Sequence, residues 1–418
     1  MDVRPGYKQT QVGFIPVDWN HRPFGYLYAE PSRNGIYKTA EFQGRGTRIV
    51  NMGEMFGFEF IADQDMSRVA LTARELSVSG LQDGDLLFGR RSVVPSGAGK
   101  CSLVVSPTEP LTFESSIIRV RLDKAVAYPL FYYYFFGSAM GRSIVGTIVS
   151  GTNVKGIRAT ELRDLPVPLP NKAEQEAIAA ALSDMDALLA KLDHLIAKKR
   201  DLKEATVQEL LCEKPGDDVR LLREVSSLKG RIGWQGLKQA EFTNNEDEPF
   251  LITGMNFKNG AIRWHEVYHI PETRYEMAPE IQLKPEDVLM TKDGTIGKVL
   301  YIDTIPHPGK ASLNSHLLLF RPAKDSYSPK YLYYQLASRR FQDYIELSKS
   351  GTTFFGLSQA AVGSYPVLLP PMPEQIRIAT ILSDMDAEIA ALEARRNKTR
   401  ALKQGMMQEL LTGRIRLV

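Results

Sequence analysis

Hydrophobic residues recur at alternating three- and four-residue steps in two long stretches of the chain. Residues 172–211 contain no proline or glycine, and residues 375–411 contain only Gly405. This spacing predicts two helices whose apolar residues form a coiled-coil seam. At ~1.5 Å per residue, a helix of about 40 residues is roughly 60 Å long, which suits a spacer between domains. The predicted seam residues are Ile178, Leu182, Met185, Leu189, Leu192 and Ile196, and Ile378, Leu382, Met385, Ile389 and Leu392.

The same six residues, LSDMDA, stand at positions 182–187 and 382–387. Their flanks agree as well, because residues 165–211 align with 365–411 without a gap and match at about half of the positions. This is an internal duplication, so the chain consists of two halves that end alike. Because each helix carries a large domain at one end, we expect the two helices to pair antiparallel. The aspartates of the repeat are expected to face solvent or a docked partner; they are Asp184, Asp186, Asp384 and Asp386.

Short alternating or β-branched runs precede each helix and predict strand-rich domains. These runs are residues 48–51, 86–88 and 117–122 in the first half and 250–253, 288–290 and 317–321 in the second. The two halves share only fragments here, such as SGT at 150–152 and 350–352. The predicted fold is therefore α+β, with two strand-rich domains separated by the two helices of an antiparallel intramolecular coiled coil in a pseudo-twofold duplication. The predicted segments are 1–170, 171–212, 213–371 and 372–418.

The composition is that of a globular protein with ordinary cores, at 418 residues with 43% hydrophobic and 24% charged side chains. With only Cys101 and Cys212, a disulfide framework and a cysteine zinc site are not supported, and we expect a cytoplasmic protein. The most apolar run, residues 125–136, is too short to span a membrane and is expected to be core. The net charge of +3 permits nucleic-acid binding without indicating it.

Glycine-rich loops with basic or small polar residues follow the predicted strands in both halves. Direct readout of DNA needs donors and acceptors on protruding loops, with Lys and Arg anchoring the phosphates. Each of these positions is also what an ordinary exposed loop would contain. The candidate DNA contacts are Arg90, Arg91, Lys100, Ser150, Thr152, Asn153, Trp234, Gln235, Lys292, Lys298, Ser350 and Thr352.

Several segments in this order resemble the specificity subunit of type I DNA restriction-modification enzymes. They are GFIPVDW (13–19), GRIGWQGLKQAEF (230–242), GDLLFGRRS (84–92), EDVLMTKDGTIGK (286–298), the two SGT loops and the LSDMDA helices. The resemblance implies two target recognition domains, each reading one half of an asymmetric bipartite site in double-stranded DNA. It also implies helices that dock two methyltransferase subunits, with restriction (translocase) subunits joining that core and no membrane association. The chain would be non-catalytic and bind no cofactor, while S-adenosylmethionine, ATP and Mg would be held by the partners.

Four segments imitate catalytic motifs. HEVYH (265–269) matches a zinc-protease pattern, but its context predicts a strand, on which the two imidazoles would be roughly 13 Å apart at ~3.3 Å per residue. FQGRG (42–46) resembles a methyltransferase loop but precedes a predicted strand. SGAGKC (96–101) and DGTIGK (293–298) lack the first glycine of a phosphate-binding loop. The main alternative to DNA reading is a coiled-coil interaction scaffold without DNA specificity, and a metalloprotease is a third, weaker hypothesis.

Overall fold

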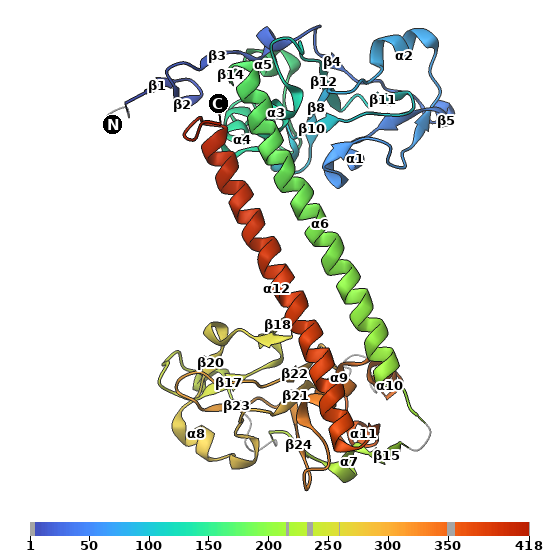
Figure 1. Cartoon of the computed structure of the whole chain (residues 1–418), viewed down its shortest axis with the longest axis vertical. Coiled ribbons are helices and arrows are strands. Elements are labelled where there is room, and N and C mark those ends of the chain that lie inside the picture. The colour runs from blue at the N-terminus through green and yellow to red at the C-terminus, as the bar shows by residue number, and fades with distance from the viewer. Residues whose placement is uncertain (1–4, 215–216, 232–236, 259, 349–355, 418) are drawn as a thin grey trace. The chain divides into compact units, whose positions relative to one another are not determined.

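The structure is a computed structural model that describes residues 5–214, 217–231, 237–258, 260–348 and 356–417. The chain divides into two compact units: unit 1 contains residues 1–193 and 394–418, and unit 2 contains residues 194–393. Both long helices, α6 (Lys172–Leu210) and α12 (Met372–Leu410), contribute one part to each unit (Figure 1). Each is 39 residues long, as the hydrophobic spacing predicted.

Unit 1 contains a five-stranded sheet with the order β4-β12-β8-β10-β6 and a three-stranded sheet with the order β11-β5-β7. The strands of the larger sheet are β4 (Arg33–Asn34), β6 (Phe60–Ile61), β8 (Leu86–Gly89), β10 (Cys101–Val104) and β12 (Ile117–Val120). Those of the smaller sheet are β5 (Gln43–Val50), β7 (Arg68–Val69) and β11 (Leu111–Phe113). Three further pairs join β1 (Tyr7–Thr10) to β2 (Gly13–Pro16), β3 (Asn20–Pro23) to β14 (Pro166–Leu169), and β9 (Arg91–Ser92) to β13 (Lys155–Gly156). The shorter helices are α1 (Met52–Gly57), α2 (Ala73–Ser79), α3 (Pro129–Gly137), α4 (Ala139–Gly146) and α5 (Ala159–Asp164).

Unit 2 contains a four-stranded sheet with the order β16-β24-β21-β22 and a three-stranded sheet with the order β20-β17-β23. Their strands are β16 (Ser226–Lys229), β17 (Phe250–Ile252), β20 (Tyr268–His269), β21 (Val288–Thr291), β22 (Val299–Tyr301), β23 (Ala311–Leu313) and β24 (Leu317–Pro322). Two further pairs join β15 (Asp218–Leu221) to β25 (Pro366–Leu369) and β18 (Phe257–Lys258) to β19 (Ala261–Ile262). The shorter helices are α7 (Leu222–Val225), α8 (Glu272–Glu276), α9 (Pro329–Ala337), α10 (Arg339–Ser348) and α11 (Gln359–Gly363). In both units, every run that the sequence predicted as a strand overlaps one, although residues 51, 121–122 and 253 lie just beyond the strand ends.

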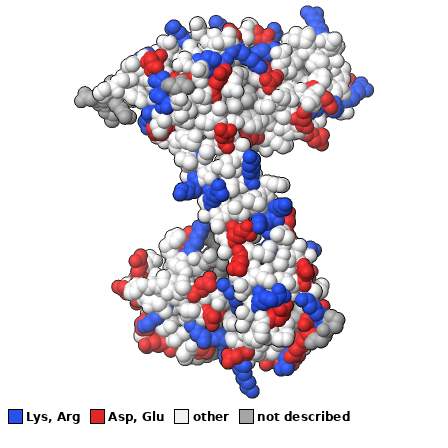
Figure 2. Space-filling view, viewed as in Figure 1, with Lys and Arg blue, Asp and Glu red and all other residues white. Residues whose placement is uncertain are grey.

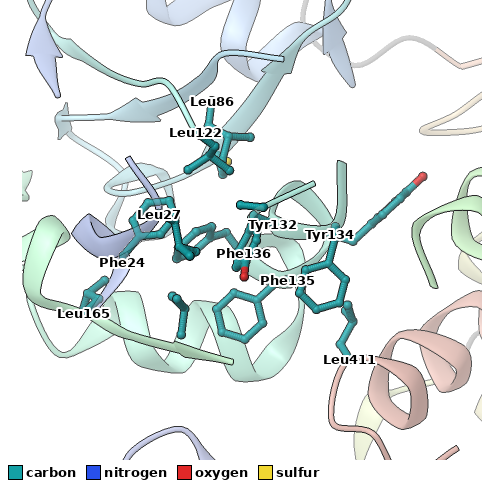
Figure 3. Close-up of a cluster of buried hydrophobic side chains, with 14 of the residues drawn as sticks. Phe24, Leu27, Leu86, Leu122, Tyr132, Tyr134, Phe135, Phe136, Leu165 and Leu411 are labelled. Atoms are coloured by element: carbon teal, nitrogen blue, oxygen red, sulfur yellow. The ribbon is translucent and has the colours of Figure 1, made fainter. Parts of the chain in front are cut away.

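The duplication extends into the globular parts of the two units. Helices α3 and α9, strands β14 and β25, and helices α6 and α12 begin 200 residues apart in each case. Helix α3 supplies much of the unit 1 core, where Tyr132, Phe135 and Phe136 pack with Phe24 and Leu27 (Figure 3). The aromatic run of residues 125–136 is therefore largely core, as predicted. Among the helices of the described ranges, none is both long enough and apolar enough to cross a membrane.

Within each unit, the two long helices run antiparallel. In unit 1, Asp186 of α6 pairs with Lys403 of α12, and Asp193 pairs with Arg396 at 3.3 Å. In unit 2, Lys199 pairs with Glu388 at 2.7 Å, and Lys203 pairs with Asp386 at 2.5 Å. The position on α12 falls as the position on α6 rises, which confirms the predicted direction. The seam is buried at Ile178, Leu182, Leu192 and Ile196 and at Ile378, Leu382 and Ile389, and half-buried at Met185, Leu189, Met385 and Leu392.

The first seam residues of each helix also belong to a core of the globular part. Ile178 and Leu182 join the unit 1 cluster that contains helix α3 and Leu411, which follows directly after α12 (Figure 3). Leu382 packs in the same way with Tyr331 and Tyr334 of α9 in unit 2. The LSDMDA repeat therefore marks the place where a long helix leaves its globular domain.

Candidate DNA-reading loops and helix junctions

In unit 1, three loops that are far apart in the sequence meet at Arg90, directly after strand β8. The N–H of Arg90 donates to the carbonyl of Ser116 at 2.7 Å, and the carbonyl of Arg90 accepts from the N–H of Ile157 at 3.0 Å. The guanidinium donates to the carbonyl of Ser115 at 3.3 Å. These bonds join the loop after β8 to the loop before β12 and the segment before α5. They bring together the regions that hold the predicted DNA contacts Arg90 and Ser150.

Unit 2 repeats this arrangement with different side chains. The N–H of Lys292 donates to the carbonyl of His316 at 2.9 Å, and its carbonyl accepts from the N–H of Leu357 at 2.9 Å. His316 stands 200 residues after Ser116, and its imidazole lies 3.1 Å from the carboxylate of Asp293. One backbone frame therefore presents a hydroxyl in unit 1 and an imidazole beside a carboxylate in unit 2. The sequence predicted Arg90 and Lys292 but missed Ser116 and His316, although their equivalent positions in the repeat could have identified them.

The other predicted DNA contacts occupy different environments. Arg91, Ser150, Thr152, Asn153 and Lys298 are exposed, and Lys292 is half-buried. Their contact with DNA stays a prediction. Trp234, Gln235, Ser350 and Thr352 lie outside the described residues.

Lys100 is held inside unit 1. Its ammonium donates to the carbonyl of Met55 at 2.6 Å and lies 4.8 Å from the centre of the Phe56 ring. Partial burial lowers the pKa of Lys100. This lysine binds the last turn of helix α1, whereas Lys298, which follows the matching loop of unit 2, is exposed. The sequence alone could not distinguish the two lysines, because the partner of Lys100 lies 45 residues away in the chain.

A buried ion pair lies in both units at the end of β8 or β21 that is opposite to these loops. The carboxylate of Asp85 accepts two hydrogen bonds from Arg121, each at 2.7 Å, and Asp287 accepts two from Arg321 at the same distance. Both aspartates are almost fully buried, so their charge depends on this bidentate partner. The pairs tie the residue before β8 or β21 to the end of the neighbouring strand, β12 or β24.

The second aspartate of each LSDMDA repeat joins a helix to its globular domain. Tyr134 of α3 donates to Asp186 at 2.7 Å, and the ammonium of Lys403 from α12 binds the same carboxylate. In unit 2, Tyr334 donates to Asp386 at 2.8 Å, and Lys203 from α6 binds that carboxylate. The expectation that these aspartates face solvent or a partner was therefore wrong for Asp186, whose side chain is 13% exposed. It holds in part for Asp386, whose side chain is 41% exposed although it bonds to two other elements. Asp184 and Asp384 are exposed, as expected.

The two histidines of HEVYH lie in different elements. His265 is exposed in a short 3-10 helix, η7 (Trp264–Glu266), whereas His269 is buried in β20. The predicted single strand was therefore wrong for the first half of the motif. The Nδ1 atom of His269 lies 2.6 Å from the carbonyl of Glu248, so this imidazole already has a partner. Over the described ranges, no group of three or more His, Cys, Asp or Glu residues is arranged to hold a metal.

Charged side chains of both signs are interspersed on the visible face of each unit (Figure 2). A DNA-binding surface on such a molecule has to be sought in local features, namely loops and single unpaired cations, because the phosphates attract any free positive charge.

Comparison with known proteins places these features in a family. The family model described as "Type I restriction modification DNA specificity domain" matches residues 79–198 and 222–400. The MjaX specificity subunit of a putative type I restriction enzyme from Methanocaldococcus jannaschii is 23% identical over 98% of this chain and 97% of its own. The EcoKI specificity subunit of Escherichia coli is 26% identical over 41% of this chain and 38% of its own. The crystal structure of the type I restriction-modification S subunit from M. genitalium has a TM-score of 0.59 at 17% identity, covering 98% of both chains. That likeness indicates a shared fold.

Proposed function

Because the chain belongs to the type I restriction-modification DNA specificity family, we propose that each unit reads one half of an asymmetric DNA target. The observation that carries the proposal is the repeated loop frame at Arg90 and Lys292, which displays different side chains in the two units. The loop after β8 is also longer than its counterpart after β21. Two like frames with unlike surfaces would read two different half-sites, so the full site would not be a palindrome.

We further propose that the helices α6 and α12 dock two copies of a methyltransferase subunit. The support is the repeated junction, in which a tyrosine, an aspartate and a lysine join each helix to its domain. Two equivalent junctions offer two equivalent seats for one kind of partner. Restriction subunits would join this core, and the assembly would work in the cytoplasm beside the DNA that it reads.

The chain itself would supply DNA contacts and no chemistry. His269 of the protease-like motif is buried against a backbone carbonyl, and the FQGRG segment runs into strand β5 instead of a helix. Methyl transfer with S-adenosylmethionine, and any cleavage that needs ATP and Mg, would belong to the partners. A partner that methylates a base has to flip it out of the duplex, and this chain would position the partner over that base.

The test is to express this subunit with its methyltransferase partner in a host without other methylation and to map the modified bases. We expect one bipartite motif with two different halves. The alternative, a coiled-coil scaffold without DNA specificity, predicts scattered modification without a motif. A salt titration of the purified complex gives a second readout, because sequence-specific binding persists at salt concentrations that abolish the non-specific electrostatic component.

A further inference from the structure

Strand β5 of unit 1 carries a bulge that lifts three residues out of the sheet. Gln43 and Thr47 both pair with Val69 of β7, so the residues between them have no place in the ladder. The two glycines of this segment have positive φ, at 84° for Gly44 and 89° for Gly46, a conformation that glycine adopts without strain. Arg45 therefore lies in the middle of the bulge, between the two glycines, on a strand that runs along the edge of unit 1 in Figure 1.

The bulge is held by its neighbours, while its arginine is not. Arg68 donates to the carbonyl of Gly46 at 3.0 Å and pairs with Glu109 at 2.9 Å, and Lys38 nearby pairs with Glu75 at 2.6 Å. Arg45 is exposed, and its side chain forms no ion pair or hydrogen bond with any residue of the described ranges. The backbone of the bulge is thus held in place, and it presents one guanidinium without a partner. Because the backbone is already ordered, binding through this guanidinium costs little backbone conformational entropy.

The bulge borders a hollow of about 310 Å³ that also reaches the loops at Arg90. Gly44, Glu114 and Ser115 are among its lining residues, and the carbonyl of Ser115 accepts the hydrogen bond from Arg90. Tyr37, which is 80% exposed, also lines the hollow. The bulge and the converging loops are therefore parts of one continuous surface.

Unit 2 has a chemically different segment at the matching position. A 3-10 helix precedes the segment in both units, η2 (Ala40–Phe42) and η5 (Gln239–Glu241), and the strand after it pairs in parallel, β5 with β11 and β17 with β23. The segments compared lie after Phe42 and Phe242 and before Arg48 and Phe250, where the parallel pairing begins. Unit 1 has QGRGT there, within β5, and unit 2 has TNNEDEP. The segment of unit 1 carries a single positive charge, and that of unit 2 carries three negative charges. The two units therefore share the elements on either side of the segment and differ in its charge.

We propose that Arg45 reads a guanine in the half-site of unit 1. A guanidinium donates two parallel hydrogen bonds to O6 and N7 of guanine in the major groove, an arrangement that the other bases do not offer. A rigid protrusion with a free arginine beside a hollow meets the requirements of such a reader. The inference rests on the proposed function, because it assigns one contact within the DNA surface of unit 1.

The test compares Arg45→Ala and Arg45→Lys with the wild type in the complex with its methyltransferase partner. Binding is measured to duplexes that carry the mapped motif and to duplexes with each single base of the unit 1 half-site replaced. We expect both variants to lose discrimination at one guanine, by roughly ten- to a hundredfold, and to methylate a motif relaxed at that position. Lysine keeps the charge but lacks the planar fork, so it should not restore the discrimination. Arg22→Ala is the matched control, because Arg22 is an exposed arginine of the same unit on β3, which pairs with β14 and not with β5.

Three outcomes would overturn the assignment. Uniformly weaker binding with an unchanged motif, restored by Arg45→Lys, would make Arg45 a phosphate contact. An unchanged motif with unchanged affinity would place Arg45 away from DNA, and relaxation in the other half-site would place it on the wrong half. If the wild-type complex itself had no bipartite motif, the proposed function would fail instead, so the two failures are distinguishable.

Discussion

The two copies of the Glu-Gln pair that open the long helices place their glutamates in opposite environments. Glu174 is fully buried in unit 1, where its carboxylate accepts hydrogen bonds from the indole of Trp19 at 2.9 Å and from Arg416 at 2.8 Å. Glu374, its counterpart in unit 2, pairs at 2.6 Å with Arg377, an exposed residue on the same helix. One sequence repeat therefore contains a buried ion pair and a surface ion pair, and removing each arginine compares the two directly.

We predict that Arg416→Ala destabilises unit 1 by about 3 kcal/mol. Breaking a buried pair costs about 3–5 kcal/mol because the remaining charge keeps its burial without its partner, and we take the lower end since Arg416 is 32% exposed. For a unit of about 200 residues, each kcal/mol lowers Tm by about 2–4 °C, so the unit 1 transition should fall by about 6–12 °C in calorimetry of the full chain. Arg377→Ala should leave Tm unchanged, because solvent screens an exposed pair.

The effect should also depend on pH. Hydrogen bonding to Arg416 lowers the pKa of Asp18 below its usual 3.8. A lowered carboxyl pKa contributes stability above the unfolded value and loses it as the pH falls through the folded value. The gap in Tm between wild type and Arg416→Ala should therefore narrow below about pH 4. The reasoning is refuted if Arg416→Ala melts with the wild type at pH 7, or if Arg377→Ala loses as much stability.

Further predictions concern the helix junctions. The side chain of Gln175 makes three hydrogen bonds to its domain, and that of Gln375 makes two. In urea unfolding, Gln175→Ala should therefore lower the free energy of unfolding by about 3 kcal/mol and Gln375→Ala by about 2 kcal/mol. Equal losses would contradict this reasoning. Burial is the main cause that raises the pKa of Glu59, and the charge of nearby Asp186 adds to it. A raised carboxyl pKa means that the ionised form destabilises the fold, so Glu59→Gln should raise Tm at pH 7. This gain in Tm should vanish below about pH 4.5, where the carboxyl is protonated in the unfolded chain as well. Leu182→Ala and Leu382→Ala should each lower the free energy of unfolding by about 2–5 kcal/mol, because both leucines are fully buried. Both variants should also capture less methyltransferase subunit in a pull-down. Unchanged capture would mean that the seam lies elsewhere.

The long helices could be predicted because their pattern is local and occurs twice. The three- and four-residue steps through Ile178 and Leu182 specify a helix face, and the second copy excludes chance. The strands were predicted for the same reason, since period-two runs define a face from neighbouring residues. The bonding of the Asp186 carboxylate could not be predicted, because its partners, Tyr134 and Lys403, lie 52 and 217 residues away in the chain.

The candidate DNA surface was predicted in part. The loop residues Arg90 and Lys292 follow strands that the sequence identifies, and both do lie where distant loops meet. Arg45 was read only as part of a methyltransferase-like segment, because a bulge is a shift in pairing register against β7 and leaves no periodic trace in the sequence. Lys100 looked like a free cation because the carbonyl that binds it belongs to a helix 45 residues earlier.

The central claim is that the two units read two different half-sites independently. The most direct measurement exchanges residues 26–164 for the corresponding segment of another family member and maps the motif methylated in a host that supplies the partner. The account predicts that one half of the motif changes while the other half and the spacing between them stay the same. A motif that stays intact, or one in which both halves change, would contradict the account.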